Sequence, residues 1–153
     1  PLGGCKDHTV DIKIASSDAE IARCFPVMAQ LRPNIIRDAF VARIRDLQRG
    51  GYELVYLEDG GELQSLAGFR IGDMLARGRH MYVDDLVTKE EAQSQGYGAA
   101  LYKWLVDLAR SRSCRQIDLD SGVKRHAAHR LYFREGMHIA SYHPESGVKI
   151  VKF

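Results

Sequence analysis

A glycine-containing loop carries the clearest chemical signal in the sequence: Gln93, Ser94, Gln95, Gly96, Tyr97, Gly98 and Ala99. It follows an apolar run, 81–88, and precedes an amphipathic segment, 99–112. A turn that opens a helix directs several unpaired N–H groups and the positive end of the helix dipole toward one point, where an anion can bind. Glycine suits such a turn because it tolerates positive φ and lets phosphate oxygens approach the backbone. The loop therefore predicts a pyrophosphate site.

Two adjacent carboxylates, Asp84 and Asp85, lie late in the apolar run before this loop. A carboxylate can serve as a general base, and burying two acids among apolar neighbours is costly without a role. Strict alternation along a strand places them on opposite faces, so only one would face a given cleft. The alternation predicts one face with Met81, Val83, Asp85 and Val87 and another with Tyr82, Asp84 and Leu86. The residues do not decide which aspartate acts, and a solvated carboxylate at a strand edge is the alternative.

The glycine spacing separates this loop from two common nucleotide-binding loops. It lacks the third glycine of a dinucleotide fingerprint and the Gly-Lys pair of a Walker loop. About thirty residues downstream, 128–137 is predicted to form a short helix with Tyr132 in its middle and Gly136 at its end. Gln-x-x-Gly-x-Gly followed by Ala-x-x-Leu-Tyr-x-x-x-Gly-Met resembles the motifs of the Gcn5-related N-acetyltransferase (GNAT) superfamily. The resemblance covers roughly 82–137.

This resemblance implies an α/β fold: a mixed, mostly antiparallel central sheet with a splayed parallel strand pair and flanking helices. It implies acetyl-CoA as co-substrate, no metal, and direct transfer of the acetyl group to a primary amine in a ternary complex. A small amine or amino-acid-like acceptor is expected, because no long acidic groove for a basic tail is visible. A protein or peptide acceptor, a longer acyl-CoA donor, and a non-catalytic acyl-CoA sensor remain alternatives.

The resemblance also assigns roles to residues. The pantetheine arm is expected along Leu86, Val87 and Thr88, and the pyrophosphate among the seven loop residues 93–99. Tyr132 is expected to protonate the departing thiolate, since a phenol has an ordinary pKa near 10. A core tyrosine that caps a backbone group is the alternative. Many family members relay the amine proton through water, so neither aspartate need be essential.

A basic cluster accompanies the tyrosine helix and consists of Lys124, Arg125, Arg130 and Arg134. It forms either a solvated face or a contact with the CoA phosphates. Gln93 stands where arginine is more frequent in the family, so Arg125 and the backbone are expected to carry more of the phosphate affinity.

Composition limits the class of protein. A chain of 153 residues, 45% hydrophobic and 27% charged, is long enough for one domain and too short for two. We expect one domain over 10–153, with a tag remnant and poorly ordered residues at 1–9. A net charge of +2 from 22 basic and 20 acidic residues, without a basic block, does not indicate a nucleic-acid surface.

Cysteine and apolar patterns indicate the compartment. Three widely spaced cysteines without a Cys-x-x-Cys pair argue against disulfides and a zinc site and favour a reducing cytosol. The histidines form no metal-ligand pattern. No stretch is apolar enough to span a membrane, and no secretory leader is recognisable. The family resemblance adds a possible homodimer.

Periodicity and turn residues predict the elements that position these groups. Helices are expected from the Ser16-Ser17-Asp18 cap to about 30, and at 34–49, 99–112 and 128–137. The stripe of the second helix is Ile36, Phe40, Ile44 and Leu47. Strands are expected at 10–14, 53–58, 63–72, 80–88 and 116–121, with a closing hairpin of 139–143 and 148–153. The unit 80–121 should pair its strands in parallel.

Overall fold

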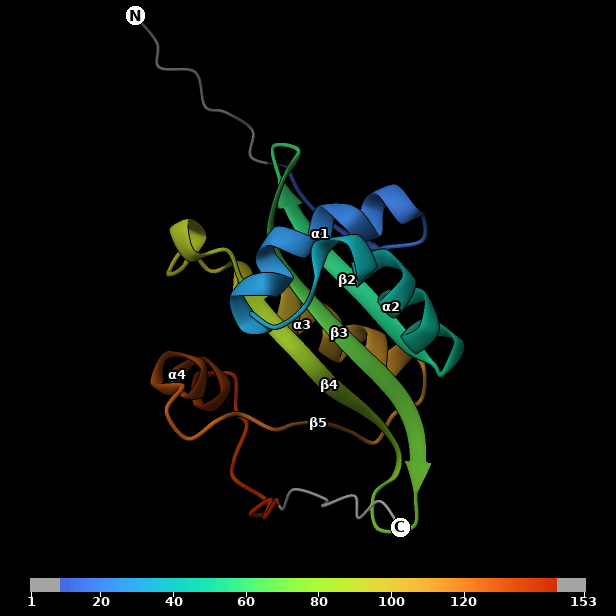
Figure 1. Cartoon of the computed structure of the whole chain (residues 1–153). Coiled ribbons are helices and arrows are strands. Elements are labelled where there is room, and N and C mark those ends of the chain that lie inside the picture. The colour runs from blue at the N-terminus through green and yellow to red at the C-terminus, as the bar shows by residue number, and fades with distance from the viewer. Residues whose placement is uncertain (1–8, 146–153) are drawn as a thin grey trace, which may run out of the picture. The chain divides into compact units, whose positions relative to one another are not determined.

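The computed structural model describes residues 9–145 (Figure 1). Its strands are β1 (Val10–Ile14), β2 (Tyr52–Asp59), β3 (Glu62–Met74), β4 (Gly78–Thr88) and β5 (Gln116–Leu119). Its helices are α1 (Asp18–Leu31), α2 (Arg37–Arg49), α3 (Tyr97–Ser111) and α4 (His126–Arg134), with a single 3-10 turn, η1 (Glu90–Ala92). The described residues group into two compact units that divide after Leu119. A single domain over 10–153 stays a prediction, and residues 1–8 lie outside the described part.

The five strands form one sheet in the order β1-β2-β3-β4-β5. Neighbouring strands run antiparallel through β4, and β5 pairs with β4 in parallel. The parallel connection passes through η1 and α3, because parallel neighbours require a crossover. The predicted mixed sheet with its parallel pair is therefore confirmed.

Helices cover both faces of this sheet within the first unit. α1 and α2 lie over one face and α3 over the other (Figure 1). Side chains of β2 alternate between these layers, and Tyr52, Leu54 and Tyr56 pack in one core with Ile21 of α1 and Phe40 of α2. Cross-strand partners share a face, so the strand register assigns each residue of β3 and β4 to one layer.

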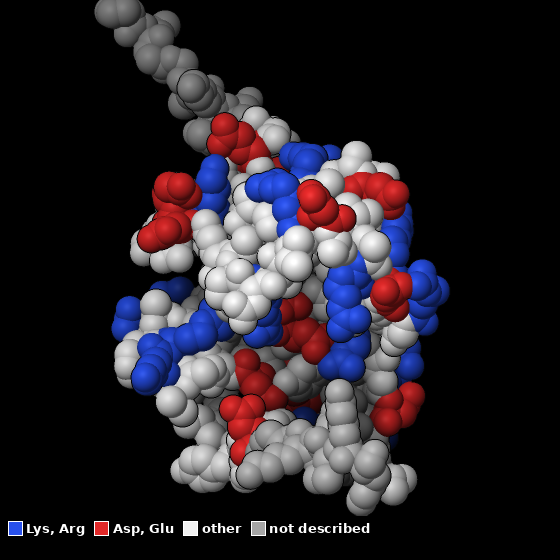
Figure 2. Space-filling view, in the orientation of Figure 1, with Lys and Arg blue, Asp and Glu red and all other residues white. Residues whose placement is uncertain are grey.

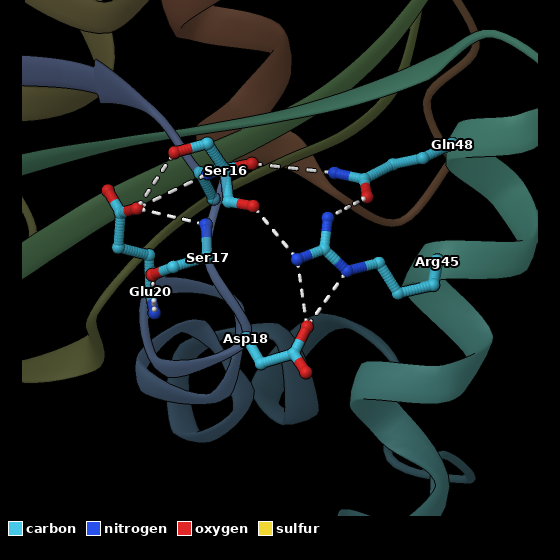
Figure 3. A network of polar contacts seen from close by, with 7 residues as sticks. Ser16, Ser17, Asp18, Glu20, Arg45 and Gln48 are labelled. Atoms are coloured by element: carbon cyan, nitrogen blue, oxygen red, sulfur yellow. Dashed lines mark hydrogen bonds and ion pairs between the residues drawn. The ribbon is translucent and has the colours of Figure 1, made fainter.

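The start of α1 is held by a capping box. Ser17 Oγ accepts a hydrogen bond from the Glu20 backbone N–H at 3.2 Å, and Glu20 Oε1 accepts one from the Ser17 N–H at 3.0 Å. Arg45 of α2 bonds Asp18 and the carbonyl oxygen of Ser16 in the same network (Figure 3). These contacts tie the first turn of α1 to α2 and explain why the predicted cap is correct.

Two predicted elements differ from the structure. α2 begins at Arg37 rather than at 34, because Pro33 is followed by a turn in which the Ile35 N–H bonds the Arg32 carbonyl. Ile36, predicted on the buried stripe, is therefore a cap residue and is 71% exposed. The predicted strand 139–143 is wrong, because these residues form no ladder. Its expected partner, 148–153, lies outside the described residues, and a two-stranded hairpin alone is marginal in water.

Candidate active site

The β3–β4 ladder contains a bulge at the aspartate pair. Gly68 pairs with Asp85, but the next residue of β3, Phe69, pairs with Val83. Asp84 is therefore an extra residue on β4, and an inserted residue shifts the alternation of the strand from that point. Beyond the bulge Leu86 pairs with Ala67.

The bulge brings both carboxylates to the layer that α1 and α2 cover. Asp85 bonds Tyr52, whose ring belongs to that core, and Asp84 bonds Arg70, which pairs with Tyr52 across β2 and β3. The prediction that the two aspartates face opposite sides is wrong, because strict alternation holds only in an unbulged strand. The observed layers place Met81, Val83 and Leu86 on the α3 side and Tyr82, Asp84, Asp85 and Val87 on the α1 side.

Asp84 is held by a two-pronged ion pair. Arg70 Nε and Nη2 donate to its two oxygens at 2.9 and 2.7 Å. The same guanidinium lies 5.7 Å from the centre of the Tyr82 ring. The hydrogen bond to Asp84 raises the pKa of Arg70, so the arginine stays charged. The pair is partly open to solvent, with the Arg70 side chain 53% exposed.

Asp85 is held from two sides. Tyr52 Oη donates to Asp85 Oδ2 at 2.8 Å, and Arg32 Nε donates to Oδ1 at 2.8 Å. Arg32 is the residue that ends α1, and its Nη2 also bonds the Asp84 carbonyl at 2.9 Å. Burial, with the nearby Asp85 charge, raises the pKa of Tyr52 well above its ordinary value, so its phenol is a constant donor. The end of α1 is therefore attached to the bulge.

The β4 edge next to the bulge has no strand partner in the described part of the chain. β5 pairs only with His80 through Val83, whereas β4 continues to Thr88. The predicted pantetheine positions lie on this free stretch: Leu86, Val87 and Thr88. Leu86 is 7% exposed, Val87 packs against the α1 core, and the Thr88 hydroxyl lies 3.1 Å from that of Ser65. The side chains of these three residues are packed or hydrogen-bonded within the protein, so the backbone amides are the groups that a ligand could reach at this edge.

The glycine loop leaves the first turn of α3 uncovered by other parts of the described structure. Gly96 caps α3 at φ +87° and Ser94 lies at φ +64°, so the chain takes two left-handed steps before the helix begins. No side chain caps this helix in the structure as described, and a Cβ on Gly96 would meet nothing within 4 Å. Gln93, Ser94 and Gln95 are exposed. The unpaired N–H groups of the first turn are thus open to an anion, as a pyrophosphate site requires.

The Tyr97 side chain contacts the end of β2. Its hydroxyl donates to Asp59 Oδ2 at 2.6 Å, at the end of β2. The side chain of Tyr97 therefore anchors the turn, and only the backbone N–H of this residue is available to a pyrophosphate. Gly98 and Ala99 follow in the first turn of α3, where their N–H groups point the same way.

Within the second unit, Tyr132 is the buried residue of α4 and is 7% exposed. Burial raises its pKa, and the nearby Arg125 guanidinium opposes part of that effect. Arg125 stands just before α4 and is half-buried, whereas Lys124, Arg130 and Arg134 are exposed. Arg125 is thus the member of the basic cluster that contacts the predicted acid.

Sequence comparison decides the family. The sequence model of the Acetyltransferase (GNAT) family matches residues 19–137. The chain belongs to the GNAT acetyltransferase family. The chain is also similar to a relative from Bacillus subtilis (strain 168), the uncharacterized N-acetyltransferase YhdJ. The two are 30% identical over 135 residues. That match covers 87% of this chain and 95% of YhdJ.

Solved structures show the same fold at lower identity. The aminoglycoside N-acetyltransferase AAC(6′)-Iy in complex with CoA superposes with a TM-score of 0.82 at 13% identity, covering 95% of this chain and 98% of that one. A transcriptional regulator from Bacillus halodurans C-125 gives a TM-score of 0.78 at 20% identity, covering 92% and 100%. The fold is that of GNAT proteins, whose members bind CoA or acetyl-CoA.

The partners of the aspartates in this GNAT protein were not found from the sequence. They are Arg32 and Tyr52, which lie 53 and 33 positions before Asp85, and Arg70, which lies 14 positions before Asp84 on the neighbouring strand. One signal was present: Gly68 stands inside an apolar strand, where a glycine often marks a bulge or a close approach. Both occur at Gly68 in this GNAT protein.

Basic and acidic side chains are interspersed over α1 and α2 (Figure 2). In residues 9–145 no cluster of three or more His, Cys, Asp or Glu side chains is arranged to hold a metal ion. None of the helices described for this GNAT protein is both long and apolar enough to cross a bilayer. A cytosolic location and a homodimer stay predictions.

Proposed function

We propose that this GNAT protein transfers the acetyl group of acetyl-CoA directly to the primary amine of a small, amino-acid-like acceptor within a ternary complex. The observation that carries the proposal is the β4 bulge, which brings Asp84 and Asp85 to one side of the sheet. The carboxylates adjoin a strand edge that has no strand partner beyond Val83 among residues 9–145. An acyl-CoA arm on that edge would end beside the groups that can accept a proton from the amine.

The donor would be held by backbone more than by side chains. The free edge of Leu86, Val87 and Thr88 offers amide groups to the pantetheine arm, as an added strand would use them. The loop from Gln93 to Ala99 offers the N–H groups that begin α3 to the pyrophosphate. Gln93 brings no charge, so Arg125 is the proposed additional phosphate ligand from the basic cluster.

The proposed reaction exchanges one bond for another. The amine nitrogen attacks the thioester carbonyl, a C–N bond forms, and the C–S bond breaks. A protonated amine loses two protons in all, and one proton is gained by the CoA thiolate. We assign the first amine proton to Asp84 or Asp85, directly or through water, from which it passes to solvent. Tyr132 donates the proton that the thiolate gains and recovers one from solvent, which takes up the second amine proton. The raised pKa of Tyr132 keeps its proton available at neutral pH.

The charges around the bulge favour an acceptor with both an amine and a carboxylate. Asp85 presents a negative charge, and the guanidinium groups of Arg32 and Arg70 lie directly beside the two aspartates. Both arginine side chains are about half exposed, at 52% and 53%, so they can turn toward a ligand carboxylate. Alternating opposite charges of this kind match an amino acid better than a simple alkylamine.

A panel assay of CoA thiol release tests this proposal. The purified protein would be given acetyl-CoA with free amino acids, their amides, simple alkylamines and a short peptide. We expect release above the amine-free blank with free amino acids, and a lower kcat/KM for amides, which lack the carboxylate. Equal rates with alkylamines would contradict the acceptor class, and faster turnover of the peptide would favour a peptide acceptor. Binding of acetyl-CoA without release on any amine would indicate a sensor.

A further inference from the structure

Tyr52 and Asp85 stand two strands apart, and Gly68 of β3 lies between them. In register, Gly68 pairs with Leu54 on β2 and with Asp85 on β4. The Tyr52 ring crosses β3 above Gly68, where a Cβ would lie 1.7 Å from the tyrosine oxygen. Real Cβ atoms do not come this close to an oxygen, so only glycine at 68 lets the Tyr52 hydroxyl reach β4.

The two partners of Asp85 differ in how firmly they are held. Tyr52 is 4% exposed and is packed in the α1–α2 core, so its bond to Oδ2 has no solvent competitor. The Arg32 side chain is 52% exposed, so its bond to Oδ1 competes with water and salt. Exposed ion pairs contribute little and exchange readily, whereas a buried hydrogen bond to a charged group is strong. One oxygen of Asp85 is fixed and the other is exchangeable.

We propose that Tyr52 is a positioning residue, which fixes Asp85 through Oδ2 so that Oδ1 receives the acceptor's ammonium group in place of Arg32. This inference rests on the proposed acetyl transfer. A primary amine has an ordinary pKa of about 8 to 10 and arrives mostly protonated at neutral pH, so it must lose a proton before it can attack the thioester. Asp85 binds the ammonium group and accepts its proton directly or through water. The neutral amine then attacks the thioester, with Tyr52 donating to Oδ2 throughout.

The Tyr52 hydroxyl should influence the reaction only through its hydrogen bond to Asp85. Tyr52→Phe keeps the ring above Gly68 and removes only the hydroxyl. Asp85 then loses its fixed partner, and Arg32 becomes its sole remaining ligand among the described residues. We expect the KM for the amine to rise and kcat/KM for the amine to fall about tenfold or more, as loss of a charged hydrogen bond implies. The KM for acetyl-CoA should stay unchanged.

A double-mutant cycle tests the inference, using CoA release with the most active amine of the panel. Wild type, Tyr52→Phe, Asp85→Asn and the double variant are compared. If Tyr52 acts through Asp85, removing its hydroxyl costs much less in the Asp85→Asn background than in wild type. A merely structural role would give the same loss in both backgrounds. That equality, or a Tyr52→Phe variant as active as wild type, would overturn the inference.

Tyr56→Phe is the matched control. Tyr56 lies on the same strand and the same face, is 2% exposed, and donates to the Glu20 carboxylate at 2.8 Å. Its variant loses an equivalent hydroxyl–carboxylate bond away from the bulge and should keep the wild-type kcat/KM for the amine. An equal loss in both tyrosine variants would overturn the positioning role. Absence of turnover by the wild type on every amine would instead overturn the proposed function, and this inference with it.

Discussion

The Tyr52 hydroxyl lies where a side chain on Gly68 would be, because a Cβ built on that glycine comes within 1.7 Å of the tyrosine oxygen. This contact lets a residue of β2 reach Asp85 on β4, across the intervening strand. The bulge at Asp84 and the glycine at 68 therefore belong to one arrangement: the first turns both carboxylates to the α1 side, and the second admits the donor that holds one of them.

Gly68→Ala should destabilise the protein. The new methyl group must displace the Tyr52 ring and break its bond to Asp85, which we expect to lower the free energy of unfolding by about 1–3 kcal/mol. Urea unfolding followed by circular dichroism measures this change. The expected sign is opposite to the usual one, because alanine in place of glycine within a strand ordinarily stabilises by roughly 0.5–1 kcal/mol.

Gly72→Ala is the control for that substitution. Gly72 lies on the same strand and the same face, and a Cβ there meets nothing within 4 Å. It should leave the stability unchanged or raise it. A Gly68→Ala protein as stable as Gly72→Ala would mean that the Tyr52 ring does not occupy the space above Gly68.

Gly96→Ala should weaken acetyl-CoA binding. The left-handed conformation of Gly96 costs a side chain about 1–2 kcal/mol, and relaxation of the loop would turn its N–H groups from the pyrophosphate. Loss of one hydrogen bond to a charged group, about 1.5–3 kcal/mol, lowers the affinity about tenfold or more. Calorimetric titration with acetyl-CoA measures the dissociation constant.

Gly51→Ala supplies the comparison for Gly96. Gly51 has φ +95° and equally open surroundings, but it lies between α2 and β2. The two substitutions should cost similar stability, whereas only Gly96→Ala should lose acetyl-CoA affinity. Equal affinity in both variants would show that the loop before α3 does not hold the pyrophosphate.

Glu20 should make the stability depend on acid pH. Its bond from the Ser17 N–H, with further bonds from Tyr56 and the serine hydroxyls, lowers its pKa from 4.5 to about 2. A lowered folded-state pKa gives a stabilisation that is complete above the unfolded value of 4.5 and is lost as the pH falls toward 2. Urea unfolding at pH 5 and pH 3 should show a larger loss in wild type than in Glu20→Gln. Parallel losses in the two proteins would contradict this account of the cap.

Tyr132→Phe should lower kcat while leaving the acetyl-CoA dissociation constant unchanged. Removal of a general acid typically reduces the rate about 10²- to 10⁴-fold. Because burial raises the pKa of Tyr132, its acid form persists through neutral pH and the loss should be seen across that range. Tyr142→Phe, in the same unit and 91% exposed, should behave as wild type. Wild-type kcat in Tyr132→Phe would leave Tyr132 with only a packing role.

The sequence predicts most of the fold because its signals are local. The Ser17 cap, the Gly60-Gly61 turn and the apolar periodicities place α1, the β2–β3 hairpin and the sheet strands within a few residues of their observed bounds. The break at Pro33 predicts that the second helix begins at about 34, but the turn after Pro33 delays α2 to Arg37. The segment 139–143 alternates like a strand, yet alternation alone supplies no pairing partner.

The sequence predicts the candidate site only where the signal lies in neighbouring residues. The glycine loop is read from its own residues, whereas the bulge depends on how β3 meets β4, which no single-strand pattern encodes. One inserted residue reversed the predicted separation of Asp84 and Asp85. Tyr52 and Arg32 are more than 30 and 50 positions from Asp85, so their bonds to it follow from sheet register and from the end of α1. Tyr132 was predicted from family resemblance, and its role stays a prediction.

Mass spectrometry of a single reaction tests the central claim of direct acetyl transfer to an amine. The wild-type protein is mixed with acetyl-CoA and the preferred amine, and the masses of the amine, the CoA species and the intact protein are followed together. We expect one N-acetylated amine for each CoA thiol released, with the protein mass unchanged. CoA release without an acetylated amine, or an acetylated protein that accumulates before product, would contradict it.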